Sequence, residues 1–193
     1  MRPQKGKQKI FTAAMTLFES QGYFATTVEQ ITTEAGVSKG LVYNYFKSKD
    51  ELLVGLIDDA TDKMTSVAKT FDSGDSMEES LLLFVDNYFS FLRNERQFLK
   101  LQLTLSLMPE LNEVVSKPQK QRSALLLKMV HGWFSQAKVA ESKSKARLLL
   151  AMLDGIALHY LFIYDRYPLT SMKSQLMQAA KDLCFNAKAG ELL

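Results

Sequence analysis

Residues 26–49 have the sequence TTVEQITTEAGVSKGLVYNYFKSK, and this stretch decides the fold. It contains two short helical patterns on either side of a glycine. Thr27 can cap the first helix and Ser38 can cap the second, while Gly36 can adopt the left-handed conformation of a tight turn between helices. The stretch therefore predicts a helix-turn-helix over about residues 27–46, a unit that places its second helix in the major groove of DNA.

The second helix of this unit has an unusual outer side. Val42 and Phe46 lie four residues apart and point inward with Val37, which leaves two tyrosines, a leucine, an asparagine and a glycine outside. A surface helix usually carries Glu, Lys, Gln and Ala instead, whereas these side chains suit bases and phosphates. The predicted DNA-binding residues are Thr27, Ser38, Lys39, Gly40, Leu41, Tyr43, Asn44, Tyr45 and Lys49.

Each outer side chain has a matching partner on DNA. Lys39 can donate to guanine or to a phosphate, Asn44 can pair with an adenine edge, and Leu41 can pack on a thymine methyl group. Tyr43 and Tyr45 can donate to phosphates. The alternative is that the tyrosines are half-buried core and the other side chains are ordinary surface.

The positive charge of the chain lies at this same end. Residues 1–50 carry seven basic and four acidic side chains, whereas residues 51–193 carry seventeen of each, so that the net charge of +3 belongs to the first segment. Binding to phosphates requires such an excess. Lys49 is an expected phosphate contact, and so is Thr27 at a helix N-terminus. Arg2, Lys5, Lys7 and Lys9 form a basic arm that can reach a phosphate or the minor groove, or else a frayed, solvated terminus.

The motifs AGVSKG (35–40) and YNYFKSK (43–49) make the pattern specific. Residues 8–57 resemble the DNA-binding domain of the tetracycline-repressor (TetR) family. The resemblance rests on these two motifs and on Ile10, the pair Leu17-Phe18 and Gly22, which lie at the family's spacing before them. Two positions depart from the family pattern: Thr32 replaces a usual Ala, and Leu41 replaces a Thr or another small residue. The resemblance implies a homodimeric repressor whose second domain binds an effector.

The remaining sequence predicts helices only, so the fold class is all-α with about nine helices. We expect a helix-turn-helix domain over residues 1–50 and a helical effector-binding and dimerisation domain over residues 51–193. The helices expected outside the helix-turn-helix are 4–20, 48–69, 76–94, 98–107, 118–137, 146–166 and 170–187.

Helix 146–166 is apolar on nearly every face, so both of its sides must be covered. Asp154 and His159 interrupt the apolar run and the run is short for a membrane span, which favours a buried helix and no contact with a membrane. One side can pack within its own domain, and the other needs a partner. Helices 146–166 and 170–187 of two chains can pair as a four-helix bundle with two-fold symmetry. The alternative is a monomer whose final helices cover each other.

Large apolar and aromatic side chains in the second domain can line a cavity for an apolar or aromatic small molecule. Most such side chains simply fill a core, and the family resemblance carries most of the argument for an effector. The predicted effector residues are Tyr88, Phe91, Met129, Trp133, Met152 and His159.

The sequence gives no support for enzymatic chemistry. Two histidines and one cysteine form no metal-ligand spacing, no nucleophile–base arrangement or Gly-rich phosphate loop is present, and we expect no cofactor. Cys184 is the single cysteine, which suits a reducing cytoplasm, and no apolar run follows the polar residues 1–9, so we expect no signal peptide.

These observations predict a cytoplasmic, homodimeric repressor that a small molecule releases from a palindromic operator. One alternative is a DNA-binding dimer controlled by a protein partner or by its abundance. The other is an enzyme or ligand carrier with a vestigial helix-turn-helix. The charge asymmetry disfavours it, and so do the intact residues Lys39, Tyr43, Asn44, Tyr45 and Lys49.

Overall fold

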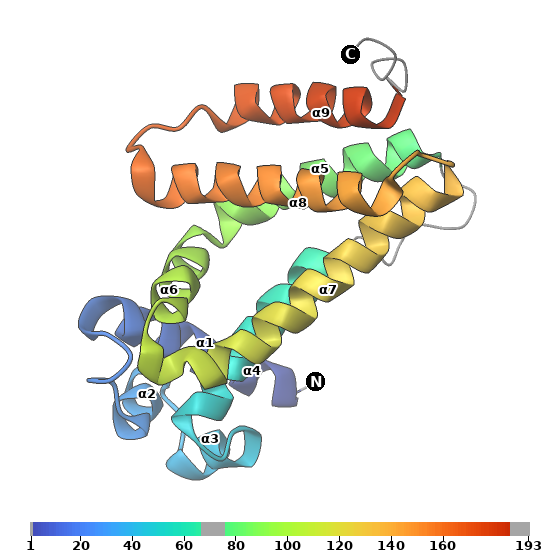
Figure 1. The fold of residues 1–193 in the computed structure, drawn as a ribbon. Helices are drawn as coiled ribbons and strands as arrows, with labels where there is room; N and C mark the ends of the chain where they lie inside the picture. Colours follow the sequence, from blue (N-terminus) through green and yellow to red (C-terminus); the bar gives the residue numbers. More distant parts are fainter. Residues whose placement is uncertain (1, 67–75, 186–193) are drawn as a thin grey trace. The chain divides into compact units, whose positions relative to one another are not determined.

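The computed structural model describes the backbone of residues 2–66 and 76–185 and the side chains of residues 5–63 and 76–184. Over these residues the chain is all-α, as predicted, with nine α-helices and no strand (Figure 1). Their bounds are α1 Arg2–Gln21, α2 Val28–Ala35, α3 Lys39–Tyr45, α4 Lys49–Ser66, α5 Met77–Asn94, α6 Arg96–Ser106, α7 Asn112–Gln136, α8 Ser142–Leu158 and α9 Leu169–Phe185. A 3-10 turn, η2 (Pro109–Leu111), precedes α7, and a π-helical turn, η3 (His159–Ile163), continues α8.

Internal contacts divide the chain into two compact units. The first unit comprises Met1–Ala60 with Gln97–Gln119, and the second comprises Thr61–Arg96 with Lys120–Leu193. Two of the three boundaries fall within α4 and α7, which each continue from one unit into the other, and the third follows Arg96, the first residue of α6. The boundary that the sequence predicts after residue 50 stays a prediction.

The core of the first unit forms around α1. Ile10, Ala14 and Phe18 are fully buried at four-residue spacing, because such residues share one face of a helix. This face packs against α2 and α3, and Phe11 adds an aromatic contact with Phe46 at the end of α3, with ring centroids 5.5 Å apart. The first helix therefore supports the two helices that follow it.

The second unit is built from α5, α8 and α9 with the later part of α7. Figure 1 shows α8 and α9 side by side, and α9 also packs against α5. Val85 and Phe89 on α5 are fully buried, as are Phe134 on α7 and Leu149 on α8. Two ion pairs connect α5 to α9 at the rim, Asp86 with Lys173 and Glu78 with Lys181, at 2.5 Å each.

One expected helix start was wrong. The sequence predicts a helix that begins at Pro118, but α7 begins six residues earlier, directly after η2, and contains Pro118. A proline within a helix removes one backbone hydrogen bond, so the sequence favoured a start there. Pro118 is buried, and burial of apolar surface compensates for the lost bond. Helix 48–69 is described to Ser66 and helix 170–187 to Phe185; the remaining residues of both lie outside the described part.

Helix α8 with η3, Ser142–Ile163, is the one described helix that is long and apolar enough to cross a membrane by length and composition. Its mean hydropathy reaches 1.6 and a third of that apolar stretch is buried; the core helix of a soluble protein meets the same criterion. The buried side holds Ala146, Leu149, Leu153 and Ile156. The opposite side remains exposed, and it includes Leu148, Leu158 and Phe162.

Candidate nucleic-acid interface

The turn between α2 and α3 has the local structure that its residues predict. The Thr27 hydroxyl accepts from the Gln30 amide at 3.2 Å, and the Gln30 side chain accepts from the Thr27 amide at 2.8 Å, which completes a capping box. Gly36 ends α2 at φ 61° and ψ 42°, in the left-handed region. The Ser38 hydroxyl then accepts from the Leu41 amide at 3.2 Å and starts α3. The helix-turn-helix prediction is confirmed at each of these residues.

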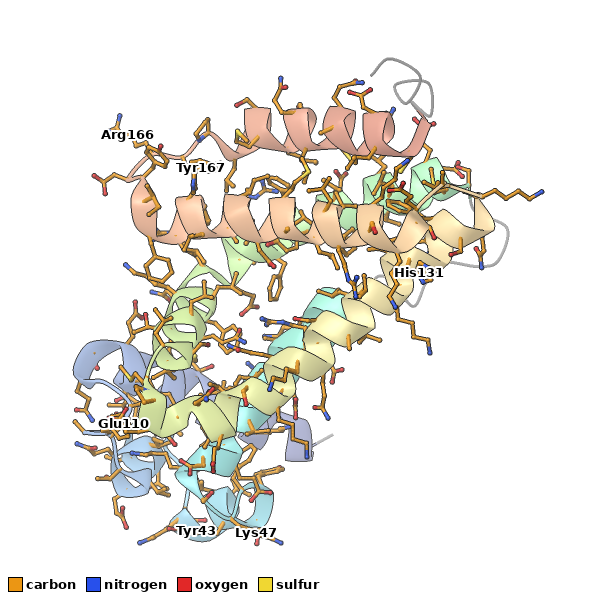
Figure 2. The ribbon with its side chains drawn as sticks, in the orientation of Figure 1. Tyr43, Lys47, Glu110, His131, Arg166 and Tyr167 are labelled. Carbon is orange, nitrogen blue, oxygen red and sulfur yellow. The ribbon has the colours of Figure 1, made fainter. Side chains whose placement is uncertain are left out.

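Helix α3 has one side in the core and the other in solvent. Val42 and Phe46 are buried, while Tyr43 and Asn44 are exposed. Figure 2 shows Tyr43 on α3 and Lys47 just after it with their side chains projecting outward. Thr27, Ser38, Lys39 and Gly40 are also exposed. A seven-residue helix anchored from one side thus presents polar and aromatic groups on the other.

Lys39 forms an ion pair with Glu29 of α2 on this exposed side. The Lys39 ammonium also lies 5.9 Å from the centre of the Tyr43 ring. Hydrogen bonding to Lys39 lowers the pKa of Glu29, and the same bond raises the pKa of Lys39, so both stay charged at neutral pH. Exposed ion pairs contribute little stability, so Lys39 can exchange this partner for a phosphate or a base edge.

Leu41 and Tyr45 are half-buried because the first turns of α1 pass close to them. A Cβ atom added at Gly6 would lie 3.3 Å from Leu41 Cδ2 and 3.6 Å from the Tyr45 hydroxyl. Glycine at position 6 therefore lets α1 approach α3 closely. Of the outer side chains expected on α3, these two are the ones partly covered by protein.

Lys49 lies differently from the expected phosphate contact. Its ammonium donates to the main-chain carbonyls of Tyr23 and Thr26 at 2.7 Å each and of Phe24 at 3.4 Å. Burial lowers the pKa of Lys49, and the nearby Asp50 carboxylate partly opposes this effect. The side chain is directed into the first unit, toward the loop that joins α1 and α2. No local pattern predicts this contact, because Lys49 and its partners lie more than twenty residues apart in the chain.

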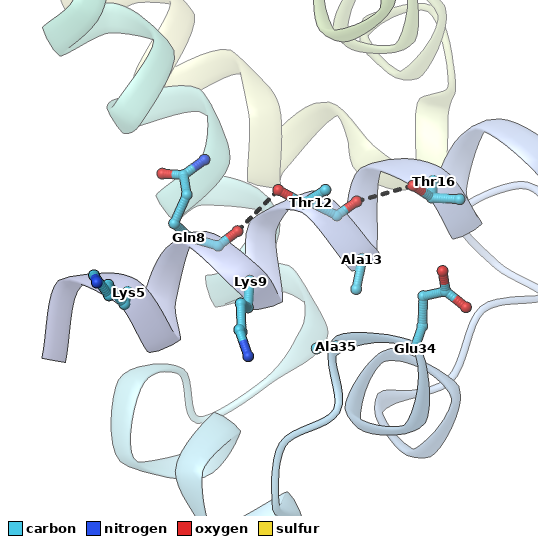
Figure 3. A pocket seen from close by; sticks show the side chains of 8 residues that line it. All are labelled: Lys5, Gln8, Lys9, Thr12, Ala13, Thr16, Glu34 and Ala35. Atoms are coloured by element: carbon cyan, nitrogen blue, oxygen red, sulfur yellow. Dashed lines mark hydrogen bonds between the residues drawn. The ribbon is translucent and has the colours of Figure 1, made fainter. Parts of the chain in front are cut away.

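The basic residues at the start of the chain lie on α1 and not on an arm before it, because the helix begins at Arg2. Lys5 and Lys9 flank a groove of about 460 Å³ between α1 and α2, with Glu34 at its other end (Figure 3). Gln8, Thr12, Ala13, Thr16 and Ala35 complete its lining. The hydroxyls of Thr12 and Thr16 donate to carbonyls of α1 one turn earlier.

The expected effector residues fall into separate groups within the second unit. Tyr88 and Phe91 on α5 are buried, and the Tyr88 hydroxyl donates to the Leu153 carbonyl at 3.0 Å, which accounts for its polar group. Met129 and Trp133 lie on α7, where Trp133 packs edge-on against Phe84 at 5.6 Å. Tyr88, Phe91 and Trp133 thus belong to the packing of the unit, whereas Met129 is half-exposed.

Met152 and His159 come together at a groove between α8 and α9. The groove has a volume of about 420 Å³, and its lining includes Ile156, Met172, Leu176 and Tyr167. The His159 ring contacts the rings of Tyr164 and Tyr167, with centroids 5.6 and 5.9 Å away; Tyr167 is labelled in Figure 2. Its apolar walls with a histidine, a tyrosine and Gln175 suit an apolar molecule with one hydrogen-bonding group.

A second polar group lies around Asp154 on α8. Burial raises the pKa of this carboxyl, although part of the residue's surface reaches solvent, and Arg122 on α7 partly opposes the rise. Burial lowers the pKa of Arg122 in turn, and it raises the pKa of Tyr88. Asp154 stands out in the sequence because it interrupts an apolar run, whereas Arg122 is one of several basic residues on a polar stretch of α7 and no pattern marks it.

The geometry on α2 and α3 agrees with a family comparison. Residues 10–56 match the model of the bacterial regulatory proteins of the tetR family. The chain carries a TetR-family DNA-binding domain. TetR-family regulators are DNA-binding transcription factors and not enzymes.

Similar proteins support this assignment over more of the chain. The chain is 32% identical over 112 residues to the uncharacterized HTH-type transcriptional regulator YerO of Bacillus subtilis. This match covers 56% of this chain and 38% of YerO. The next two curated relatives are matched over 54% and 22% of their lengths, so the chain spans about half or less of these three proteins.

Solved structures extend the similarity to both units. A TetR/AcrR-family regulator of Aquifex aeolicus superposes with a TM-score of 0.70 at 25% identity, over 91% of this chain and 98% of that one. FadR of Bacillus subtilis, solved in complex with stearoyl-CoA, superposes with a TM-score of 0.72 at 20% identity, over 92% and 97% of the two chains. The fold of the described chain is therefore the TetR fold.

Proposed function

We propose that this TetR-family protein is a cytoplasmic, homodimeric repressor that binds a palindromic operator and leaves it when a small molecule binds the second unit. The outer side of α3 carries the proposal. Lys39, Tyr43 and Asn44 are exposed there, next to a buried Val42 that holds the helix in place. These groups can contact base edges and phosphates of a major groove.

The exposed side of α8 supports a dimer. Leu148, Ala151, Gly155, Leu158 and Phe162 follow each other at three- and four-residue spacing and are all exposed. Residues at this spacing form one stripe along a helix, and small residues between large ones let a second helix approach. A second copy of the chain, related by a two-fold axis, covers this stripe with its own.

Two copies also explain how a short helix achieves specificity. Dimeric helix-turn-helix proteins place two recognition helices about one helical turn apart on a two-fold operator. Each copy then contributes one exposed α3, and the affinity depends on the separation between the two helices. A palindromic operator follows from this symmetry.

The groove between α8 and α9 is the effector site that the second unit offers, with Met152 and His159 on its wall. FadR, whose fold is similar, binds stearoyl-CoA; we propose for this chain only an apolar or aromatic molecule with a polar group. An effector that prefers the DNA-incompetent conformation shifts the population toward it. Helices α4 and α7 are continuous from one unit to the other and can transmit the change.

The test of this proposal is a fluorescence-anisotropy titration of the purified protein. The DNA upstream of its own gene is compared with a shuffled duplex of the same composition at several salt concentrations. We expect a preference of about 10³-fold or more for a specific operator. If no duplex from a genome-wide selection is preferred over shuffled DNA, sequence-specific regulation is the wrong function.

A further inference from the structure

Gly6 lies within α1, where glycine is an unfavourable residue. The helix begins at Arg2, and alanine suits a helical position better, because glycine loses more conformational freedom when a helix forms. The backbone does not require glycine here either, since the described glycines with positive φ are Gly22 and Gly36. The use of a glycine at position 6 therefore depends on the side chains that surround it.

Those side chains belong to the recognition helix α3. A Cβ atom at position 6 would lie 3.3 Å from Leu41 Cδ2, 3.6 Å from the Tyr45 hydroxyl oxygen and 3.8 Å from Tyr45 Cε2. The first distance is tighter than an ordinary van der Waals contact, whereas the two distances to Tyr45 are within the ordinary range. Position 6 thus accommodates a hydrogen atom beside Leu41 but not a methyl group.

The core of the first unit holds both helices in place around this contact. Ile10 and Ala14 of α1 are fully buried, and so is Val42 of α3. Phe46, which ends α3, is buried against α4, where a Cβ atom added at Gly55 would lie only 2.7 Å from Phe46 Cε1. The backbones of α1 and α3 are therefore fixed relative to each other, and a methyl group added at position 6 must displace a side chain.

Leu41 is the side chain that can be displaced. Its Cδ2 atom is the far end of a flexible side chain, and the residue is half-buried, so that it has space on its outer side. A rotation of Leu41 costs the fold little. It costs the proposed contact with a thymine methyl group more, because the attraction between apolar groups falls steeply over a few tenths of an ångström.

We propose that Gly6 is a positioning residue that determines specificity: it lets α1 lie against Leu41 and so fixes the direction in which Leu41 meets a base edge. Gly6 acts through Leu41 and lies outside the helix-turn-helix. This inference rests on the proposed operator binding and assigns α1 a part in the reading of sequence.

The test measures the affinity for a set of operators in which each base pair is replaced in turn. The wild type is compared with Gly6→Ala, Leu41→Ala and the double variant, and Leu41→Ala identifies the base pair that Leu41 reads. We expect Gly6→Ala to reduce the preference at that base pair by about threefold or more, out of the roughly 5- to 150-fold that one base pair contributes. Preferences elsewhere should stay unchanged, and the double variant should behave like Leu41→Ala.

Three results would overturn the inference. The first is a Gly6→Ala variant with wild-type preferences at every base pair. The second is an equal loss of affinity on all operators, which would show that α1 contributes to binding but not to the reading of sequence. The third is an effect of Gly6→Ala that persists when Leu41 is already alanine, because Gly6 would then act through another residue.

Gly132→Ala is the matched control. It adds the same methyl group to a helix, α7, at a position with no neighbouring atom within 4 Å, and it should leave all base preferences unchanged. The midpoint of thermal unfolding separates the proposed role from a merely structural one. It should not fall in Gly6→Ala, since alanine favours the helix, whereas a structural role predicts a lower midpoint with unchanged base preferences.

NMR of the wild-type protein tests the same contact if Gly6→Ala does not fold, which far-UV circular dichroism shows. A nuclear Overhauser effect between the Gly6 Hα atoms and a Leu41 methyl group should be present in the free protein and at operator saturation. Its absence from the operator complex would contradict the inference. A wild-type protein without operator preference would refute the proposed function and this inference with it, whereas the three results above, with a wild type that prefers its operator, refute the inference alone.

Discussion

Val42 and Tyr43 are neighbours on α3, yet Val42 is 1% exposed and Tyr43 is 45% exposed. Their contrast shows how a helix of seven residues serves two purposes. One side holds the helix against α1 and α2, and the other is exposed, where we propose that it meets DNA. Substitutions on the outer side should therefore change binding without changing the fold.

Tyr43→Ala should weaken operator binding by about two- to tenfold, because one hydrogen bond contributes about 0.5–1.5 kcal/mol net. Dimerisation and helicity should stay unchanged, since the side chain is exposed. Anisotropy, sedimentation velocity and far-UV circular dichroism measure the three quantities. Unaltered operator affinity would remove Tyr43 from the DNA contacts.

Asn44→Ala should relax discrimination at one base position of the operator, with a loss of about 1–3 kcal/mol against the cognate base. A set of operators with each base pair replaced in turn shows which position is affected. An equal loss of affinity on every sequence would assign Asn44 to a phosphate.

Gly36→Ala should destabilise the first unit by about 1–2 kcal/mol, because Gly36 lies at φ 61°, where a Cβ atom is strained. Hydrogen exchange at the amides of α2 and α3 measures the effect in the full chain. Gly40→Ala is the control, since Gly40 is helical and its added Cβ would meet only Ser38 Oγ, at 4.0 Å. Equal protection in both variants would show that the turn does not need a glycine.

Leu158→Glu should shift the protein toward the monomer, because it buries a charge in the proposed interface of α8. Sedimentation equilibrium should show a dimer dissociation constant at least tenfold higher than that of the wild type. Leu82→Glu on α5 is a matched control, since Leu82 and Leu158 are 48% and 47% exposed. If the two variants associate equally, the exposed stripe of α8 is not the dimer interface.

The sequence by itself determined the helix-turn-helix, because its signals are local. Thr27, Gly36 and Ser38 act on the backbone within three residues of themselves, and the inward and outward sides of α3 follow from helical periodicity alone. The start of α7 was missed for the same reason, since Pro118 is a local signal that η2 and burial override.

The tertiary structure decided what depends on distant partners. Lys49 has the chemistry of a phosphate contact, but its carbonyl partners lie more than twenty residues earlier in the chain, and only folding brings them together. In the same way, folding places Met152 and His159 at one groove. It places Tyr88 in the core, where its hydroxyl donates to the Leu153 carbonyl. A side chain's type limits which partners it can take, and the packing of helices selects among them.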